Sequence, residues 1–357
     1  MTINEYFERF SSDTVAGSAN QVLMPIEKRI TSTGRVAYRL ADGGEYYSLL
    51  YSNLIDSTYD KGQHSKCNDM GEDWQIHQLK MGLSDSLEQF PEEMTVVTFD
   101  GNSEKTVSGP EIFCTDPVLL NGRKNQYLHL EMTFSGRRFP SHVEINIDVK
   151  KKNENGEFVF NTDMPVPLMV GVDRDIKKRI GFIGDSITQG IGTPRESYLH
   201  WVAQIKEGLG KDVSVWDLGI GYSRGSDAAT NGFWLERAKK CDVVNVCFGV
   251  NDINAGRTFE QITGDLETIN GLLNEAGCKT VAITVPPFNF TGDARTRWEK
   301  INEYIRTVLS KKADGFFDFA KYTCDDAPND NMAKYGGHPD IEGSTVIANA
   351  YLKDVKI

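Results

Sequence analysis

The fold of this chain is indicated most clearly by residues 179–190, which read RIGFIGDSITQG. The first part of this stretch is apolar and ends abruptly at Gly184-Asp185-Ser186. Ligands in open α/β sheets bind outside the carboxyl ends of the strands, so Ser186 stands where a buried strand surfaces and a helix could begin. Such a serine can be a nucleophile, if a base and an oxyanion hole lie nearby, or merely a helix cap. The stretch is not a G-x-S-x-G elbow, because Thr188 occupies the second glycine position.

From this stretch onward, short apolar runs alternate with longer amphipathic segments. Continuous apolar strands that alternate with helices are typical of a parallel sheet covered on both faces. The expected strands are 180–183, 213–216, 243–248, 280–285 and 315–317. The expected helices are 198–209, 233–238, 259–275, 296–311 and 343–352. In 259–275 the apolar residues recur at helical spacing, which indicates a face turned toward the core.

The first half of the chain has a different sequence pattern. Short segments rich in β-branched and aromatic residues are separated by turn residues, at 35–40, 46–51, 94–99, 127–134, 142–149 and 158–160. Strict alternation in 142–149 predicts a half-buried antiparallel strand, and Asp100-Gly101 and Asn155-Gly156 predict hairpin turns. We therefore expect a β-sandwich or jelly-roll-like accessory domain over 1–175 and an α/β catalytic domain over 176–357.

Composition is that of an ordinary soluble protein, with 357 residues, 39% hydrophobic residues and a net charge of −12. This charge disfavours nucleic acid and anionic lipid as partners. We recognise no secretory signal and no apolar run long enough to span a membrane, and we expect a cytoplasmic protein. The six cysteines are scattered without CxxC pairing, which favours a reducing compartment and no structural zinc.

Three further motifs could complete the chemistry of Ser186. The carboxamide of Asn251, which follows an expected strand in FGVNDI, could donate to an oxyanion, or could belong to a turn and helix cap. A glycine-containing loop with Gly221 follows another strand and could point a backbone N–H at a ligand. Among the six histidines, His338 lies in the loop GGHPD before the last expected helix, which suits a positioned base, whereas His200 is better explained by packing.

Together these motifs resemble those of the SGNH (GDSL-type) esterases and acylhydrolases over roughly residues 178–357. Gly184-Asp185-Ser186 looks like the first sequence block of that family, GVND at 249–252 like the third and His338-Pro339 like the fifth. The resemblance implies a flavodoxin-like α/β/α domain in which Ser186 is the nucleophile and His338 the base. It also implies an oxyanion hole of the Ser186 N–H, the Asn251 side chain and a second-block N–H. We assign that last donor to Gly221, with Tyr222 as the alternative.

One residue departs from the family pattern. The acid that usually stands three residues before the histidine is replaced by Tyr335. An orienting partner holds the imidazole tautomer and stabilises the imidazolium. Three interpretations remain open: a Ser-His dyad with a backbone carbonyl as the orienting group, which we favour; a substitute carboxylate; or impaired catalysis. The candidate carboxylates are Asp330, Asp340 and Asp326.

The β-rich half is similar, more loosely, to modules that precede the hydrolase in two-domain bacterial members of the superfamily, among them polysaccharide acetyl esterases. We therefore expect a serine carboxyl-ester hydrolase that removes O-acetyl groups from oligosaccharides and needs no cofactor. Its oligomeric state is not predicted. The alternatives are an acyl thioesterase or lysophospholipase-like lipid hydrolase and, from another class, a carbohydrate-binding protein whose catalytic site has decayed at Tyr335.

Overall fold

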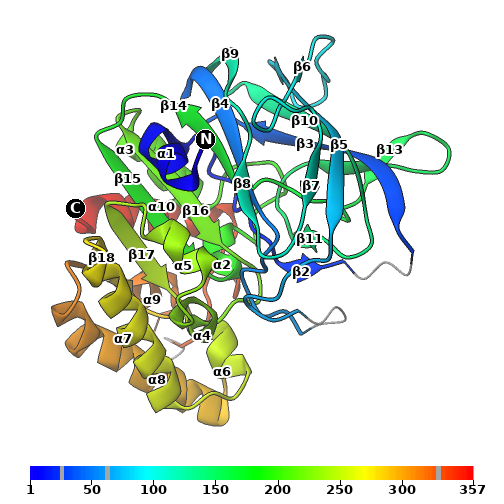
Figure 1. Ribbon diagram of the computed structural model, residues 1–357. Coiled ribbons are helices and arrows are strands. Elements are labelled where there is room, and N and C mark those ends of the chain that lie inside the picture. Colours follow the sequence, from blue (N-terminus) through cyan, green and yellow to red (C-terminus); the bar gives the residue numbers. More distant parts are fainter. Residues whose placement is uncertain (25–27, 61–64, 327–330, 357) are drawn as a thin grey trace. The chain divides into compact units, whose positions relative to one another are not determined.

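Two units of different architecture make up the protein, as seen in the computed structural model of Figure 1. Unit 1 comprises Met1–Ile176 and unit 2 comprises Lys177–Ile357. The structure describes residues 1–24, 28–60, 65–326 and 331–356. Each unit has its own hydrophobic core, and each is described separately below.

Unit 1 is built from antiparallel sheets. The larger has the strand order β13-β12-β3-β10-β5-β6 with β7 also on β5, the second has the order β1-β14-β4-β8 with β9 also on β4, and β2 pairs with β11. The helix and strands are α1 (Ile3–Arg9), β1 (Phe10–Ser12), β2 (Val22–Leu23), β3 (Ile30–Arg39), β4 (Gly43–Ser52), β5 (Trp74–Ser84), β6 (Thr95–Val96), β7 (Lys105–Val107), β8 (Ile112–Cys114), β9 (Val118–Arg123), β10 (Tyr127–Gly136), β11 (Pro140–Ser141), β12 (Val149–Lys152), β13 (Phe158–Phe160) and β14 (Met169–Asp173). The β-rich character of this half is confirmed, while its description as a sandwich or jelly roll stays a prediction.

The strand expected over 142–149 is the main error in unit 1. Residues 142–148 form turns, including a hydrogen bond from the Ile145 N–H to the His142 carbonyl, and β12 begins only at Val149. The alternation does report burial, because Ile145 and Ile147 are each 1% exposed. Hydrophobic alternation thus indicates which side chains are buried, but it does not ensure that the backbone forms hydrogen bonds with a neighbouring strand.

Both predicted turns of unit 1 are present. Asp100 and Gly101 have φ angles of 50° and 81°, and the Phe99 and Asn102 backbones exchange hydrogen bonds across them. Gly156, with φ of 86°, lies in the turn of the hairpin between β12 and β13. Positive φ at both central positions of the Asp100-Gly101 turn matches the right-handed twist of the flanking strands, whereas in the second turn only the glycine has a positive φ.

Unit 2 contains a five-stranded parallel sheet with the order β16-β15-β17-β18-β19. Its strands are β15 (Lys178–Gly184), β16 (Val213–Gly219), β17 (Val243–Cys247), β18 (Lys279–Ile283) and β19 (Gly315–Phe317). Numbered within the unit, this order is 2-1-3-4-5, which is the flavodoxin-like arrangement of doubly wound sheets. The predicted parallel α/β architecture is confirmed. Because every strand runs the same way, the residues that follow β15, β16 and β17 meet at one edge.

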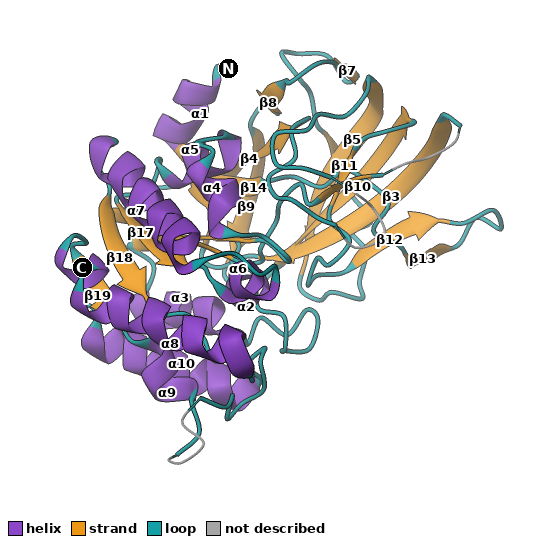
Figure 2. Ribbon diagram, turned by 90° about the horizontal axis from the view of Figure 1, so that it is seen from below, coloured by secondary structure: helices purple, strands orange, loops and turns teal. Residues whose placement is uncertain are grey.

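Helices lie on both faces of this sheet in Figure 2. α3 and α10 contact each other, and α7 contacts α4 and α8. The helices are α2 (Ser186–Gln189), α3 (Trp201–Leu209), α4 (Gly225–Ala229), α5 (Phe233–Ala238), α6 (Val250–Asn254), α7 (Phe259–Glu275), α8 (Gly292–Thr307), the 3-10 turn η1 (Leu309–Lys311), α9 (Phe319–Thr323) and α10 (Ile341–Asp354). The helix expected over 198–209 begins at Trp201, because Tyr198 has a φ of 52° that an α-helix cannot accommodate.

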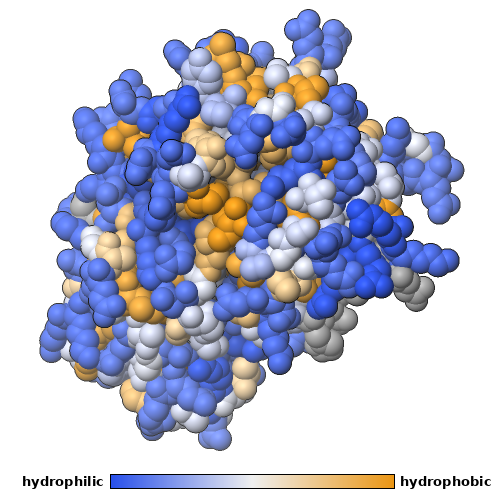
Figure 3. Space-filling model, viewed as in Figure 1, coloured by the Kyte–Doolittle hydropathy of each residue, from blue (hydrophilic) through white to orange (hydrophobic). Residues whose placement is uncertain are grey.

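The face shown in Figure 3 is mostly hydrophilic, with hydrophobic side chains in small groups. None of the helices in the described part of the chain has the length and apolarity needed to cross a bilayer. Exposed large hydrophobic residues occur in both units; they include Leu119, Phe160 and Val159 in unit 1 and Leu199 and Ile341 in unit 2.

Candidate active site

Ser186 is the first residue of α2, two positions after the last residue of β15. The side chain of Asp185 caps this helix by accepting the Ile187 N–H at 2.9 Å, and burial raises the pKa of Asp185 to about 7. A Cβ atom on Gly184 would lie 2.2 Å from Thr188 Oγ1, so only glycine allows this tight return of the chain. The first backbone N–H groups of a helix have no partner within it, so the Ser186 N–H is not used inside α2.

His338 contacts the hydroxyl of Ser186. The Ser186 Oγ and the His338 Nε2 are 2.7 Å apart, although 152 positions separate the two residues in sequence. Burial lowers the pKa of His338, so that the imidazole is neutral near pH 7 and able to accept a proton. The geometry is that of a nucleophile hydrogen-bonded to a general base.

The loop that carries His338 is fixed by close backbone contacts. Gly192 has a φ of 110°, and a Cβ atom there would lie 2.7 Å from the carbonyl oxygen of His338. The Phe288 ring stands edge-on to the imidazole, with a centroid distance of 5.4 Å and an interplanar angle of 84°. A Cβ on Gly337 would lie 2.8 Å from the same phenyl ring. Phe288 therefore packs on the candidate base.

Asn251 lies in α6, which follows β17. Its Nδ2 donates to the Ser223 carbonyl at 3.0 Å, and the Ser223 hydroxyl donates to the Gly184 carbonyl at 3.0 Å. These bonds join the loops after the three neighbouring strands β15, β16 and β17. A carboxamide nitrogen carries two hydrogens, so the arrangement provides a second N–H for a substrate oxygen.

The residue after Asn251 has a structural role. Asp252 is fully buried and accepts hydrogen bonds from Arg257 Nη1 at 2.6 Å and from the Gly225 N–H at 3.1 Å. Burial raises the pKa of Asp252, and Arg257, which also pairs with Asp265, opposes that rise. The carboxylate therefore joins α6 to the start of α4 and holds Asn251 in position.

The assignment of Gly221 as an oxyanion donor is wrong. Its backbone N–H donates to Gln189 Oε1 at 2.7 Å, within the protein interior. An N–H held by a buried amide oxygen at this distance is not presented to a substrate. Tyr222, the alternative in the same loop, has a φ of 64° and stays a prediction. The role of Gln189 was missed, since a single glutamine near the end of a glycine-rich motif gives no sequence signal of its own.

No carboxylate among the described residues hydrogen-bonds His338. Asp340 caps α10 by accepting the Gly343 N–H at 2.9 Å, which contradicts its assignment as the orienting acid. Asp326 is exposed, and Asp330 lies outside the described residues. Tyr335, at the position of the family acid, packs against α10, where a Cβ on Gly343 would lie 2.5 Å from the tyrosine Cβ.

The other histidine of unit 2 is part of the core. His200 precedes α3, is 3% exposed, and places its Nε2 3.2 Å from Asp217 Oδ2. The Asp217 side chain also accepts the Gly219 N–H at 2.8 Å, and burial raises the pKa of Asp217. His200 thus has a buried carboxylate partner, in agreement with the expectation that it packs.

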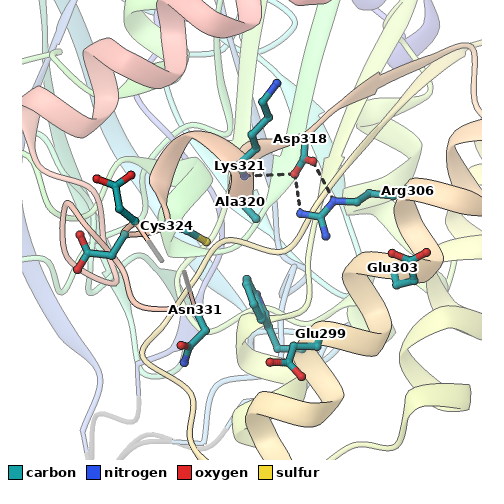
Figure 4. A pocket seen from close by; sticks show the side chains of 11 residues that line it. Glu299, Glu303, Arg306, Asp318, Ala320, Lys321, Cys324 and Asn331 are labelled. Carbon is teal, nitrogen blue, oxygen red and sulfur yellow. Dashed lines mark hydrogen bonds and ion pairs between the residues drawn. The ribbon is translucent and has the colours of Figure 1, made fainter. Parts of the chain in front are cut away.

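A separate cavity of about 660 Å³ lies beside β19 (Figure 4). Asp318, directly after this strand, forms a two-point ion pair with Arg306 at 2.9 and 3.0 Å. Asp326 lines this cavity, whereas Ser186, Asn251 and His338 do not. Asp326 therefore belongs to a different hollow from the three candidate site residues.

Comparisons with known proteins agree with the motif assignment. Residues 182–346 match the sequence profile of the GDSL-like Lipase/Acylhydrolase family. No curated protein matches the chain.

Several solved structures are similar to part of this chain. A lipolytic protein of the G-D-S-L family from Desulfitobacterium hafniense is 18% identical, with 50% of this chain and 99% of that chain covered and a TM-score of 0.43. A catalytic mutant of an acetylxylan esterase from Geobacillus stearothermophilus is 19% identical, with 52% and 96% covered and a TM-score of 0.40. A carbohydrate acetylesterase family member from Sinorhizobium meliloti is 18% identical, with 50% and 96% covered and a TM-score of 0.37.

The profile match falls wholly within unit 2 and contains the first and third motif blocks together with His338. The profile that contains these motifs describes lipases and acylhydrolases, enzymes that cleave ester bonds. Unit 2 therefore matches the GDSL-like Lipase/Acylhydrolase family over residues 182–346, and the protein is a hydrolase that acts on ester bonds.

Proposed function

We propose that the protein is a serine carboxyl-ester hydrolase that removes O-acetyl groups from carbohydrates. The observation that carries the proposal is the 2.7 Å contact between Ser186 Oγ and His338 Nε2. Within a domain that matches an acylhydrolase family, a neutral imidazole that holds a serine hydroxyl at this distance supports nucleophilic catalysis. The retention of Ser186, Asn251 and His338 together argues against a decayed site.

In the proposed reaction, Ser186 Oγ attacks the ester carbonyl while His338 Nε2 takes the hydroxyl proton. The oxyanion that forms on the carbonyl oxygen accepts hydrogen bonds from the Ser186 N–H and from Asn251 Nδ2, whose loop the Ser223 carbonyl holds in place. The imidazolium then protonates the departing sugar hydroxyl, which leaves an acyl-enzyme. Water, deprotonated by His338, attacks the acyl carbonyl and releases the carboxylic acid and Ser186.

A Ser-His dyad is the arrangement that we propose for the base. Burial lowers the pKa of His338, and no carboxylate among the described residues hydrogen-bonds its ring. The ring is then oriented by its packing against Phe288 and by the short contacts of its loop with Gly192. A backbone carbonyl at Nδ1 completes the dyad, and Asp330 is the competing candidate for that position.

The choice of acetylated carbohydrates follows from the organisation of the whole chain. A β-rich unit followed by a GDSL-type unit is the arrangement that resembles polysaccharide acetyl esterases. The net charge of −12 also favours neutral substrates over polyanions. A cytoplasmic location, in which the enzyme would act on imported oligosaccharides, remains part of the proposal.

The test compares hydrolysis of p-nitrophenyl acetate and p-nitrophenyl octanoate by the intact protein and by its Ser186→Ala variant. We expect turnover of the acetate that is lost in the variant, and little cleavage of the octanoate by either. Labelling by a fluorophosphonate probe should likewise require Ser186. Acetylated xylo-oligosaccharide would then be tested as the natural type of substrate, with released acetate as the readout.

Each other outcome changes the proposal in a defined way. Preference for octanoate would identify a lipid hydrolase or a long-chain thioesterase. Turnover that persists in Ser186→Ala would remove Ser186 from the mechanism. If neither ester is cleaved and the fluorophosphonate does not label the protein, the decayed carbohydrate-binding protein becomes the better description.

A further inference from the structure

A small cavity lies on the larger sheet of unit 1. It has a volume of about 210 Å³ and is lined by residues of β3, β10 and β13, by Asp148 and Lys150 around the start of β12, and by the segment 87–90. Its floor includes Ala37 on β3 and the cross-strand partner of Ala37 on β10, His129. The small side chain of Ala37 leaves space between taller neighbours.

An arginine held between two aromatic rings forms one wall of the cavity. The Arg35 Cζ lies 3.5 Å from the centroid of Phe90 and 3.8 Å from that of Phe158. Two rings this close to one carbon atom must stack on opposite faces of the guanidinium. Arg35 also pairs with Glu131 at 2.8 Å, so its planar group is fixed from three sides.

The charges around the cavity balance. The Lys150 Nζ lies 2.7 Å from Asp148 Oδ2, and Arg35 is paired as described above. His129 donates to or accepts from Ser84 Oγ at 2.8 Å, and burial lowers the pKa of His129, which keeps its ring neutral near pH 7. Glu88, the fourth charged residue of the lining, is exposed. Two cations and two anions in the lining favour a neutral ligand that offers several hydrogen-bonding groups over an ion of either sign.

Apolar surface continues from the cavity along the edge strand β13. Phe158 lines the cavity, and Phe160, two residues further on, is 50% exposed and is the cross-strand partner of Lys150. Exposed aromatic residues on an edge strand are a liability unless they bind something. A sugar ring has C–H groups that pack on aromatic rings and hydroxyl groups that bind polar side chains. Aromatic rings next to fixed polar side chains therefore suit a sugar.

We infer that this cavity binds one ring of a neutral oligosaccharide, with the neighbouring sugar unit against Phe160. The volume is below the roughly 300–1,000 Å³ of sites for drug-sized ligands and suits a single ring. Unit 1 is then a carbohydrate-binding module with its own site. The choice of a carbohydrate rests in part on the function proposed for unit 2.

The experiment measures binding of xylohexaose, mannohexaose and cellohexaose by isothermal titration calorimetry. It uses the full chain carrying Ser186→Ala, so that no turnover disturbs the titration. We expect at least one hexasaccharide to bind. Adding Ala37→Leu, which fills the hollow without removing a polar group, should weaken that binding at least tenfold. Phe158→Ala should weaken it about fivefold, and Val159→Ala, at the intervening position of the same strand, less than twofold.

Two results would overturn the inference: no binding of any of the three hexasaccharides, or the same affinity in the parent and in both Ala37→Leu and Phe158→Ala. Circular dichroism identifies a variant that does not fold, and Phe158→Ala, at a half-exposed position, serves if Ala37→Leu fails in this way. Hydrolysis of p-nitrophenyl acetate by the same variants with Ser186 intact should be unchanged. This second readout separates failure of the sugar site from failure of the proposed esterase.

Discussion

In a catalytic triad one histidine contacts both a nucleophile and a carboxylate, whereas in unit 2 these two partners belong to two different histidines. His338 contacts the hydroxyl of Ser186 but no carboxylate among the described residues, whereas His200 contacts the carboxylate of Asp217 but no nucleophile. His200 and Asp217 are 3% and 0% exposed, so their pair lies within the core. The comparison teaches that a His-Asp contact is not by itself a sign of catalysis. Access to a nucleophile at a strand end is the more informative feature.

The largest expected effect comes from removing the histidine beside Ser186. His338→Ala takes away the only group positioned to accept the hydroxyl proton in the proposed mechanism. We expect kcat for p-nitrophenyl acetate to fall about 10⁴-fold, with little change in Tm because the side chain is not in the core. Steady-state kinetics and calorimetry test this, and a variant that keeps more than a tenth of the activity would contradict the assignment.

The opposite pattern is expected for the other histidine. His200→Leu leaves the buried Asp217 without its imidazole partner and should lower the free energy of unfolding by about 3 kcal/mol. The kcat for p-nitrophenyl acetate, measured well below the unfolding temperature, should stay within threefold. Urea unfolding monitored by tryptophan fluorescence provides the stability, since Trp201 is adjacent and buried. His200→Gln, which can still donate to Asp217, is the matched control, and loss of activity without loss of stability would make His200 a functional residue.

The pH dependence sharpens the comparison further. His338 must be neutral to act as a base, and burial lowers its pKa, so the acid limb of kcat/KM should have its midpoint below 6.5. Tyr335→Asp introduces a carboxylate three residues before His338, at the position of the family acid. A nearby negative charge stabilises the imidazolium, so the midpoint should rise by about one unit. Tyr335→Asn controls for the loss of the ring, and an equal shift in both variants would exclude an electrostatic cause.

The smallest effect is expected at Asp340, which sequence reasoning considered as an orienting acid. Because its side chain caps α10, Asp340→Ala should lower stability by about 1 kcal/mol with kcat within twofold of the parent. Asn is an equally good cap, so Asp340→Asn should change neither stability nor activity. A large fall in kcat for both variants would restore Asp340 to the site.

The elements of unit 2 were predictable because their sequence carries strong and redundant signals. The strand β19 and the helices α5 and α7 have the bounds that were expected, and α7 also has a capping box formed by Thr258 and Gln261. Residues at the ends of parallel strands must share one edge of the sheet, which is why Ser186 and Asn251 could be grouped before the structure was known.

The errors have a common physical origin in contacts that no local pattern encodes. The N–H of Gly221 is held by Gln189, a partner 32 positions away. Residues 142–148 have the side-chain alternation of a strand but do not form one. The packing of Phe288 on His338 depends on how two distant loops meet. Sequence periodicity reports burial well, whereas the partner of each hydrogen bond is decided by the assembled structure.

The long sequence separation between Ser186 and His338 has a consequence for synthesis of the protein. At about 5–20 residues per second, the 152 positions between them take a ribosome roughly 8–30 s to translate. During that interval the nascent chain carries the proposed nucleophile without its base, and a chain interrupted before residue 338 never acquires one. Esterase activity would thus report that synthesis has passed residue 338, just before α10, with no inhibitor needed to keep the growing chain inactive.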